Sequence, residues 1–200
     1  MKKPLKNYAF IDAQNVNLAV RDCNWQLDWR KLRVYLREKY GVELAYLFIG
    51  YIEENQDLYQ SLQKAGYILI FKETLMHKDG KVKGNCDAEL VLQAMIDYDK
   101  YEKAVIVTGD GDFACLVRHF KKKGKLKKVL VPNMKAYSAL LKKAAAEEYL
   151  DFLNHLKNKL SYKPHTSHDP RPSTAPTVPG VVPPPGGRNK KYPRKMKSTR

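Results

Sequence analysis

The feature that most constrains this 200-residue chain is an alternation of short apolar runs with longer segments of helical spacing. Several runs are almost continuously apolar, as is typical of parallel strands that are covered on both faces. The expected strands are residues 8–11, 44–52, 68–71, 104–107 and 129–131. Helices are expected between them, the first containing Trp29 and the last spanning 149–160. The alternation predicts an α/β fold: a doubly wound, mostly parallel sheet of about five strands with helices on both faces.

Composition divides the chain near Leu160. Residues 161–200 contain nine of the eleven prolines, and nine Lys or Arg against one acidic residue, Asp169. A segment with so little to bury cannot offset its ordering entropy. We therefore expect a folded domain over 1–160 and a disordered, Pro-rich basic tail over 161–200. Such a tail attracts polyanions, including nucleic acid, although a tail that only aids solubility fits the same composition.

Several classes of protein are disfavoured by what the sequence lacks. No run of eighteen apolar residues occurs, so no membrane-spanning helix is expected. The apolar stretch before Asp12 is too short for a signal peptide. Three cysteines without a CxxC pair indicate neither a disulfide framework nor a zinc site. A cytoplasmic protein is therefore expected.

Acidic residues follow two of the expected strands. Asp12 comes directly after the first strand, and Asp110 and Asp112 follow the fourth. Another acid, Asp87, stands at the expected start of a helix after a long connection. In doubly wound sheets the functional site lies beyond the carboxyl ends of the strands, where the strand order reverses. If the first and fourth strands are neighbours there, these aspartates meet in one crevice.

Four carboxylates in one crevice require a compensating cation or a raised pKa. At ~5 Å and an effective dielectric constant of ~20, each pair repels by roughly 3 kcal/mol. Because oxygen ligands alone select a hard ion, the pattern predicts bound Mg²⁺ or Mn²⁺. Such an ion activates water and neutralises charge on a leaving oxygen, which is the chemistry of phosphodiester hydrolysis.

Simpler interpretations of the same residues stay open. Asp12, Asp87 and Asp112 each stand where a helix could begin, so each could be an N-cap. Residues 109–114, GDGDFA, formally match a dinucleotide-binding fingerprint. They follow the fourth strand rather than the first, and their aspartates would face the pyrophosphate. A nicotinamide cofactor is therefore disfavoured.

Three ordered motifs give the chain a family resemblance. They are FIDAQN ending at Asn15, KGNCDAEL starting at Lys83 and VTGDGDF starting at Val107, followed by SALLK from Ser138. From about residue 7 to residue 149 the chain resembles the NYN domains of the PIN-like ribonuclease superfamily, particularly their LabA-like branch.

The resemblance implies a PIN-like fold in which the four aspartates bind metal and RNA is the substrate. It also implies that Asn15 lies beside them as an orienting or substrate-contacting group. Thr108 stands where relatives often have serine and keeps the hydroxyl group, so it is expected in the same substrate site.

Two groups of lysines could contact nucleic acid. Lys78, Lys81 and Lys83 lie in the connection that delivers Asp87, and we expect them to hold substrate phosphates. A merely solvated loop is the alternative. Six lysines between residues 121 and 128 follow the helix 113–120 and are expected far from the acids. They fit a solvated helix end, favoured by the helix dipole, or a second RNA track.

Together these observations predict a Mg²⁺- or Mn²⁺-dependent endoribonuclease whose partner is RNA, with a homodimer as a possible assembly. A non-catalytic RNA-binding or regulatory module on the same fold is the first alternative. The second is a phosphatase with Asp12 as nucleophile. That interpretation calls for a lysine directly after the fifth strand, where Pro132 and Asn133 stand.

Overall fold

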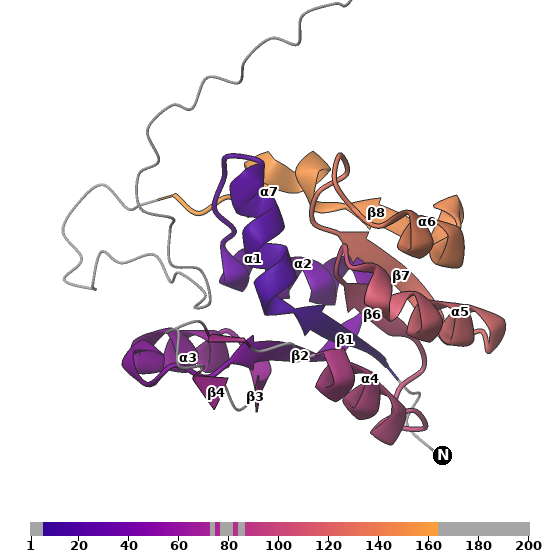
Figure 1. Ribbon diagram of the computed structural model, residues 1–200, viewed down its shortest axis with the longest axis horizontal. Coiled ribbons are helices and arrows are strands. Elements are labelled where there is room, and N and C mark those ends of the chain that lie inside the picture. The colour runs from indigo at the N-terminus through magenta and orange to yellow at the C-terminus, as the bar shows by residue number, and fades with distance from the viewer. Residues whose placement is uncertain (1–5, 73–74, 77–81, 84–86, 164–200) are drawn as a thin grey trace, which may run out of the picture.

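The computed structural model describes residues 6–72, 75–76, 82–83 and 87–163, with side chains described for 6–71 and 87–163. At their centre is a six-stranded parallel sheet with the strand order β3-β2-β1-β6-β7-β8 (Figure 1). Its strands are β1 (Asn7–Asp12), β2 (Val42–Gly50), β3 (Tyr67–Lys72), β6 (Ala104–Val107), β7 (Leu126–Val131) and β8 (Leu150–Phe152). A separate antiparallel pair comprises β4 (Leu75–Met76) and β5 (Val82–Lys83).

Helices connect the strands and cover both faces of the sheet (Figure 1). The α-helices are α1 (Ala13–Asp22), α2 (Trp29–Tyr40), α3 (Gln56–Lys64), α4 (Asp87–Ile96), α5 (Ala114–Lys122), α6 (Ala139–Ala145) and α7 (Lys157–Leu160). Short 3₁₀ turns are η1 (Glu53–Asn55), η2 (Gly111–Phe113), η3 (Glu147–Tyr149) and η4 (Leu153–Leu156). Within the described ranges, every helix is too short or too polar to span a bilayer.

The strand order reverses between β1 and β6. The chain moves outward from β1 through β2 and β3, then crosses back to pair β6 with the other edge of β1. Ile11 lies opposite Val107 in this pair, which confirms that the first and fourth expected strands are neighbours. Asp12 and Thr108 follow these two residues, so both strand ends open on one crevice. This is the position at which doubly wound sheets place their ligands.

Alternate side chains of the strands enter two different cores. Ala9 and Ile11 of β1 pack with α1, α2, α3 and α7, whereas Phe10 packs with α4, α5 and α6. All three side chains are fully buried. The period of two follows from the strand geometry. Close packing on both faces fixes the strand ends and hence the residues that follow them.

The first helix begins earlier than expected. α1 follows β1 without a loop, and the Asp12 side chain caps it by accepting a hydrogen bond from Asn15 N at 3.0 Å. The expected first helix, which contains Trp29, is the second. α1 buries few apolar side chains, with Val16 and Val20 as its larger ones, and this weak periodicity concealed it.

The expected helix over 149–160 is wrong. Leu150 and Phe152 instead belong to β8, which pairs with Val129 and Val131 of β7 and adds a sixth strand. A strand here buries Leu150 at the sheet edge, which a helix in this place would not do. Only α7 in this segment is α-helical.

The predicted basic tail lies outside the described residues beyond position 163. The described part continues past Leu160, because Ser161 forms a bridge with Leu27 and Tyr162 N donates to Gln26 O at 2.9 Å.

The lysine-rich segment begins at the end of α5 and continues into β7. Lys125 donates to the carbonyl oxygens of Tyr98 and Tyr101 at 2.8 and 2.6 Å. Lys128 donates to the carbonyl of Glu148 at 2.8 Å. β7 is parallel to β6 and the segment precedes it, so these lysines lie at the opposite end of the sheet from the strand-end acids. At least two of the six therefore have structural partners.

Candidate metal centre

Three carboxylates from two parts of the chain meet beyond the end of β6. Each of Asp87, Asp110 and Asp112 offers an oxygen, and these oxygens all lie within 4.8 Å of one another. Asp87 is the first residue of α4, Asp110 caps η2, and Asp112 lies within η2. The structure thus brings together residues that are more than twenty positions apart in the sequence.

Hydrogen bonds fix the loop that carries two of these acids. Asp110 N donates to the Thr108 hydroxyl at 3.1 Å, and Asp112 N donates to Asp110 Oδ1 at 3.1 Å. Gly109 N donates to the Asn15 side chain at 2.7 Å, which ties the loop to α1. The cap interpretation is correct for Asp12, while Asp110, for which no cap was expected, caps η2. A residue that caps a helix can still belong to an acidic cluster.

Asp12 lies beside the cluster, partly buried at the end of β1. Burial, together with the charges of Asp87 and Asp110, raises its pKa to about 6, against the hydrogen bond from Asn15 N, which lowers it. From the sequence, all four aspartates were expected to share one metal site. Asp87 belongs to the group whose oxygens lie within 4.8 Å of one another, whereas Asp12 is outside that group.

Thr108 and Asn15 position the acids. The Thr108 side chain is fully buried, and its hydroxyl lies 3.5 Å from Asp12 Oδ2 while it accepts the bond from Asp110 N. Full burial favours a positioning role for Thr108, and its expected contact with substrate stays a prediction. The Asn15 side-chain oxygen is likewise used by Gly109 N, which favours its orienting role.

The lysines expected to hold phosphates cannot be placed. Lys78 and Lys81 lie outside the described residues, and so does the side chain of Lys83, whose backbone belongs to β5. The connection that contains them ends at Asp87, so their expected role stays a prediction.

Two glycines allow α6 to approach the acidic loop. A Cβ atom on Gly111 would collide with the side chain of Ser138, the N-cap of α6. A Cβ on Gly109 would lie 3.4 Å from Asn15 and from Tyr137. Ser138 N also donates to Gly109 O at 3.0 Å. The SALLK motif that begins at Ser138 is therefore the element that supports the acidic loop from the other side.

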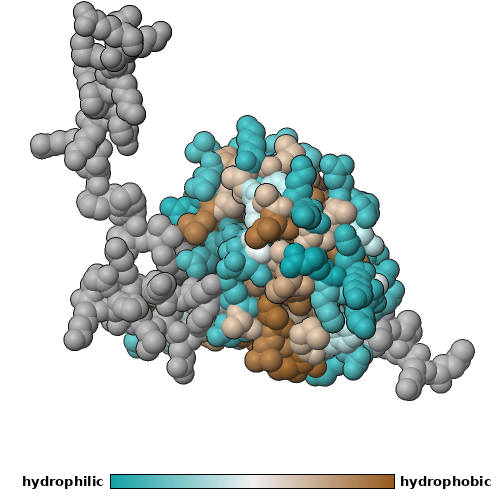
Figure 2. All heavy atoms as spheres, turned by 45° about the vertical axis from the view of Figure 1, so that its right-hand side comes forward, coloured by the Kyte–Doolittle hydropathy of each residue, from teal (hydrophilic) through white to brown (hydrophobic). Residues whose placement is uncertain are grey.

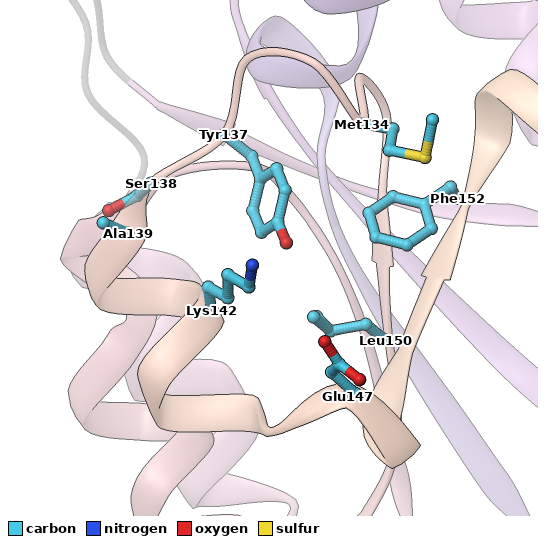
Figure 3. A pocket seen from close by; sticks show the side chains of 8 residues that line it. All are labelled: Met134, Tyr137, Ser138, Ala139, Lys142, Glu147, Leu150 and Phe152. Carbon is cyan, nitrogen blue, oxygen red and sulfur yellow. The ribbon is translucent and has the colours of Figure 1, made fainter.

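A pocket that was not expected from the sequence lies next to this contact (Figure 3). It encloses about 540 Å³ between α6, η3 and β8. Its lining residues are Met134, Tyr137, Ser138, Ala139, Lys142, Glu147, Leu150 and Phe152. Leu150 and Phe152 come from the segment expected to be a helix over 149–160, and the unrecognised strand β8 concealed how they converge with the other lining residues.

The chemistry of the donor set fits a hard divalent cation. Three carboxylates within 4.8 Å repel one another, and the loop hydrogen bonds prevent them from moving apart freely. All the donors are oxygen atoms, which favours Mg²⁺ or Mn²⁺ over zinc. The arrangement can therefore hold such an ion and, through it, the oxygens of a phosphate group.

Comparisons with known proteins agree with this geometry. The model of the NYN domain family matches residues 7–153. Over 122 residues, 56% of this chain, the sequence is 28% identical to the low amplitude and bright protein LabA of Synechococcus elongatus. That match spans 65% of LabA, which is just under two thirds of its length. A solved structure of a Vibrio parahaemolyticus protein of unknown function shares the fold, with a TM-score of 0.65 and 20% identity over 81% of this chain and 99% of that one.

Proposed function

Because the chain belongs to the NYN domain family, in its LabA-like branch, we propose that it is a metal-dependent endoribonuclease. The observation that carries the proposal is the convergence of Asp87, Asp110 and Asp112 at the strand-order reversal. In this proposal the three acids hold Mg²⁺ or Mn²⁺. Asp12 lies beside the three acids, and its charge adds to the attraction for the cation.

The ion would supply an activated water and neutralise the charge that develops on the leaving oxygen. The chain's own contribution is to hold the acids in place. Thr108 and Asn15 fix the acidic loop, and the buried end of β1 keeps Asp12 facing the cluster. This rigidity is what a phosphodiester needs in order to be oriented for in-line attack.

A basic groove between α5 and α6 supports RNA as the ligand. It encloses about 560 Å³ and is lined by Leu140, Ala144 and four cations, Arg118, Lys121, Lys122 and Lys143. No carboxylate lines it, and none of the four cations belongs to the ion pairs found among the described residues. Unpaired cations that line one groove favour a polyanion.

The groove also lies in a suitable place for a strand that passes the acids. α5 starts two residues after Asp112, and α6 starts directly after Ser138, the residue that packs on Gly111. At a rise of 1.5 Å per residue, Lys122 lies roughly 12 Å along α5 from its first residue. RNA held at the acids could therefore continue between the two helices. In the view of Figure 2, hydrophilic residues cover much of the molecule, with hydrophobic residues between them.

The homodimer expected from the sequence is part of the proposal, with α4 as its contact. Leu92 and Ile96 of α4 are 60% and 58% exposed, and Met95 lies beside them at 40%. Apolar side chains gathered on one exposed helix favour a protein contact. The mass of the protein in solution, compared with that of a Leu92→Glu/Ile96→Lys variant, tests this assignment.

Cleavage of a labelled single-stranded RNA with Mn²⁺ tests the proposed activity. We expect cleavage by the wild-type protein that EDTA abolishes, and a decrease of about 100-fold or more for Asp110→Asn. Asp57→Asn, an exposed acid on α3, is the matched control and should cleave normally. Undiminished cleavage by Asp110→Asn would refute the assignment of the site.

The same assay, together with RNA binding, distinguishes the first alternative from a nuclease. A non-catalytic RNA-binding module would bind the RNA with equal affinity in EDTA and Mn²⁺ and would accumulate no product. Release of phosphate from small phosphomonoesters, without RNA cleavage, would instead indicate the phosphatase.

A further inference from the structure

We propose that the pocket between α6, η3 and β8 binds a guanine base of the RNA, beside the acidic cluster. The inference rests on the proposed function for the identity of the polymer. It adds a base-specific subsite to a fold whose acidic cluster alone would act on any phosphodiester. The subsite combines an aromatic wall with one cationic and one anionic side chain.

The pocket adjoins the acidic loop directly. Ser138 lines the pocket and also touches Gly111, which lies between Asp110 and Asp112. Tyr137 lines the pocket as well, and its Cβ lies beside Gly109. A nucleotide whose phosphate lies at the acids therefore has its base within reach of the pocket.

Two aromatic rings form the wall on which a base can stack. The Tyr137 and Phe152 rings are 5.7 Å apart with an interplanar angle of 63°, and both side chains are only partly buried. Figure 3 shows Tyr137 extending into the pocket from the α6 side and Phe152 from the β8 side. The pocket volume of about 540 Å³ is typical of small-molecule sites. Stacking on such rings binds every base, because each base has a π face.

Two charged groups give the pocket a preference among the bases. Lys142 offers only hydrogen-bond donors and Glu147 only acceptors, and both side chains point into the pocket (Figure 3). The Watson–Crick edge of guanine presents an acceptor, O6, followed by two adjacent N–H donors. The other three bases present no two adjacent donor groups. A carboxylate that accepts both donors, with an ammonium at O6, therefore matches guanine.

The backbone between these two residues is strained in a way that serves the pocket. Ala146 has φ 69° and ψ 159°, a conformation that only glycine adopts freely. Its N–H donates to Lys142 O and so ends α6, while its carbonyl accepts from Tyr149 N and so begins η3. The resulting turn directs Glu147 back toward the pocket. Strain of this kind persists where the surroundings hold it, and it is concentrated at functional sites.

Binding of short RNAs by the full chain tests the inference without requiring cleavage. The probes are fluorescent hexauridylates that carry one central G, A, C or U, measured on the wild-type chain with Ca²⁺ in place of Mn²⁺. We expect the G probe to bind about tenfold more tightly than the others. Glu147→Gln should reduce this preference to less than about threefold, because the amide can accept only one of the two bonds. Glu148→Gln, the exposed neighbouring acid, should leave it intact.

The contrary results fall into three groups, and each group rejects a different statement. Equal binding of all probes, no binding, or a G preference that Glu147→Gln leaves unchanged overturns the guanine pocket. Free GMP that binds as tightly as the G probe would assign the pocket to a free nucleotide, which also overturns it as an RNA subsite. A G preference that depends on Glu147, in a protein that cleaves no RNA with Mn²⁺, upholds the pocket and rejects only the nuclease.

Discussion

Asp12 is an acid of the candidate site whose ionisation depends on the fold. Burial and the charges of Asp87 and Asp110 raise its pKa to about 6, whereas in an unfolded chain the value is near 4. The folded protein therefore holds this proton more tightly than the unfolded chain does. By linkage, the stabilising contribution of Asp12 is complete below about pH 4 and is lost as the pH rises through about 6.

Replacing Asp12 by Asn should remove this pH dependence. Without divalent cations, the wild type should lose up to about 3 kcal/mol of unfolding free energy between pH 4 and pH 8 through this group, and the variant should not. Asn keeps a capping oxygen for α1, so the helix itself should not be lost. Urea unfolding at the two pH values measures the effect, with Asp57→Asn as control. Parallel pH profiles for wild type and Asp12→Asn would contradict the raised pKa.

Gly111 is important because it has no side chain, which leaves room for Ser138. Gly111→Ala should destabilise the protein by about 1–3 kcal/mol and slow RNA cleavage, because the added methyl group displaces Ser138 and the acidic loop. Ser138→Gly alone should cost only a few tenths of a kcal/mol, since glycine is an acceptable N-cap. The double variant should recover most of the loss in a double-mutant cycle. Additive losses would show that Ser138 is not the obstacle.

At the scale of elements, α4 is the helix that carries Asp87, and Asp97 anchors its opposite end. The Asp97 side chain is 2% exposed and accepts hydrogen bonds from Tyr46 at 2.6 Å, Gln93 at 2.8 Å and Lys100 at 2.7 Å. Tyr46 belongs to β2, so the carboxylate ties the helix to the sheet. The position of Asp87 therefore depends on a residue far from the acidic cluster.

Asp97→Ala should weaken both stability and the metal site. Loss of the buried acceptor leaves the Tyr46 hydroxyl without its partner and should cost about 2–4 kcal/mol of unfolding free energy. It should also raise the Mn²⁺ concentration needed for cleavage, because α4 loses its anchor. Asp99→Ala, an exposed neighbour, serves as control for both measurements. Full stability of Asp97→Ala with unchanged metal dependence would show that α4 needs no such anchor.

If the groove between α5 and α6 binds RNA, its lysines should contribute to the salt dependence of RNA affinity. Lys122→Ala/Lys143→Ala should lower the slope of log K against log salt for single-stranded RNA by about 1.4, close to 0.7 for each lost phosphate contact. Lys39→Ala/Lys64→Ala removes the same charge from α2 and α3, on the other face, and should change the slope little. Equal changes in the two variants would indicate a general charge effect instead of a groove.

The elements that the sequence predicted and those that it missed differ in how they are buried. β1, β2 and β6 are continuous apolar runs inside the sheet, and such runs are visible in any sequence. β8 has three residues and is a strand only because β7 provides an edge, a tertiary cause that no local pattern contains. α1 shows the same limit, since its few buried side chains give it little periodicity.

For the whole molecule, topology explains why the candidate site was foreseeable in outline. The strand order reverses between the neighbouring strands β1 and β6, so the residues that follow these strands lie close together. The acids could therefore be grouped from the sequence alone. Which of the acids lie closest together could not be predicted, because this depends on how deeply Asp12 is buried and on where α4 begins. The aromatic pocket was out of reach for the same reason, as it needs β8 and the turn at Ala146.

A bound divalent cation should stabilise the molecule as a whole, since the acids join the start of α4 to the end of β6. At about a hundredfold excess over its dissociation constant, the ion contributes about 2.7 kcal/mol, which raises Tm by roughly 5–10 °C for a chain of this size. The rise should be larger at pH 8 than at pH 5, because at pH 5 Asp12 is largely protonated and its proton competes with the cation.

Thermal unfolding with Mg²⁺ or Mn²⁺, against NaCl of equal ionic strength, measures this stabilisation. Asp110→Asn lacks one of the three clustered carboxylates and should show little of the rise at either pH. Because Asp57→Asn loses the same charge on α3, it should retain the wild-type response. If Asp110→Asn and wild type rise equally, the cations act on the protein surface in general, and the convergence of acids at the strand ends is not a metal centre.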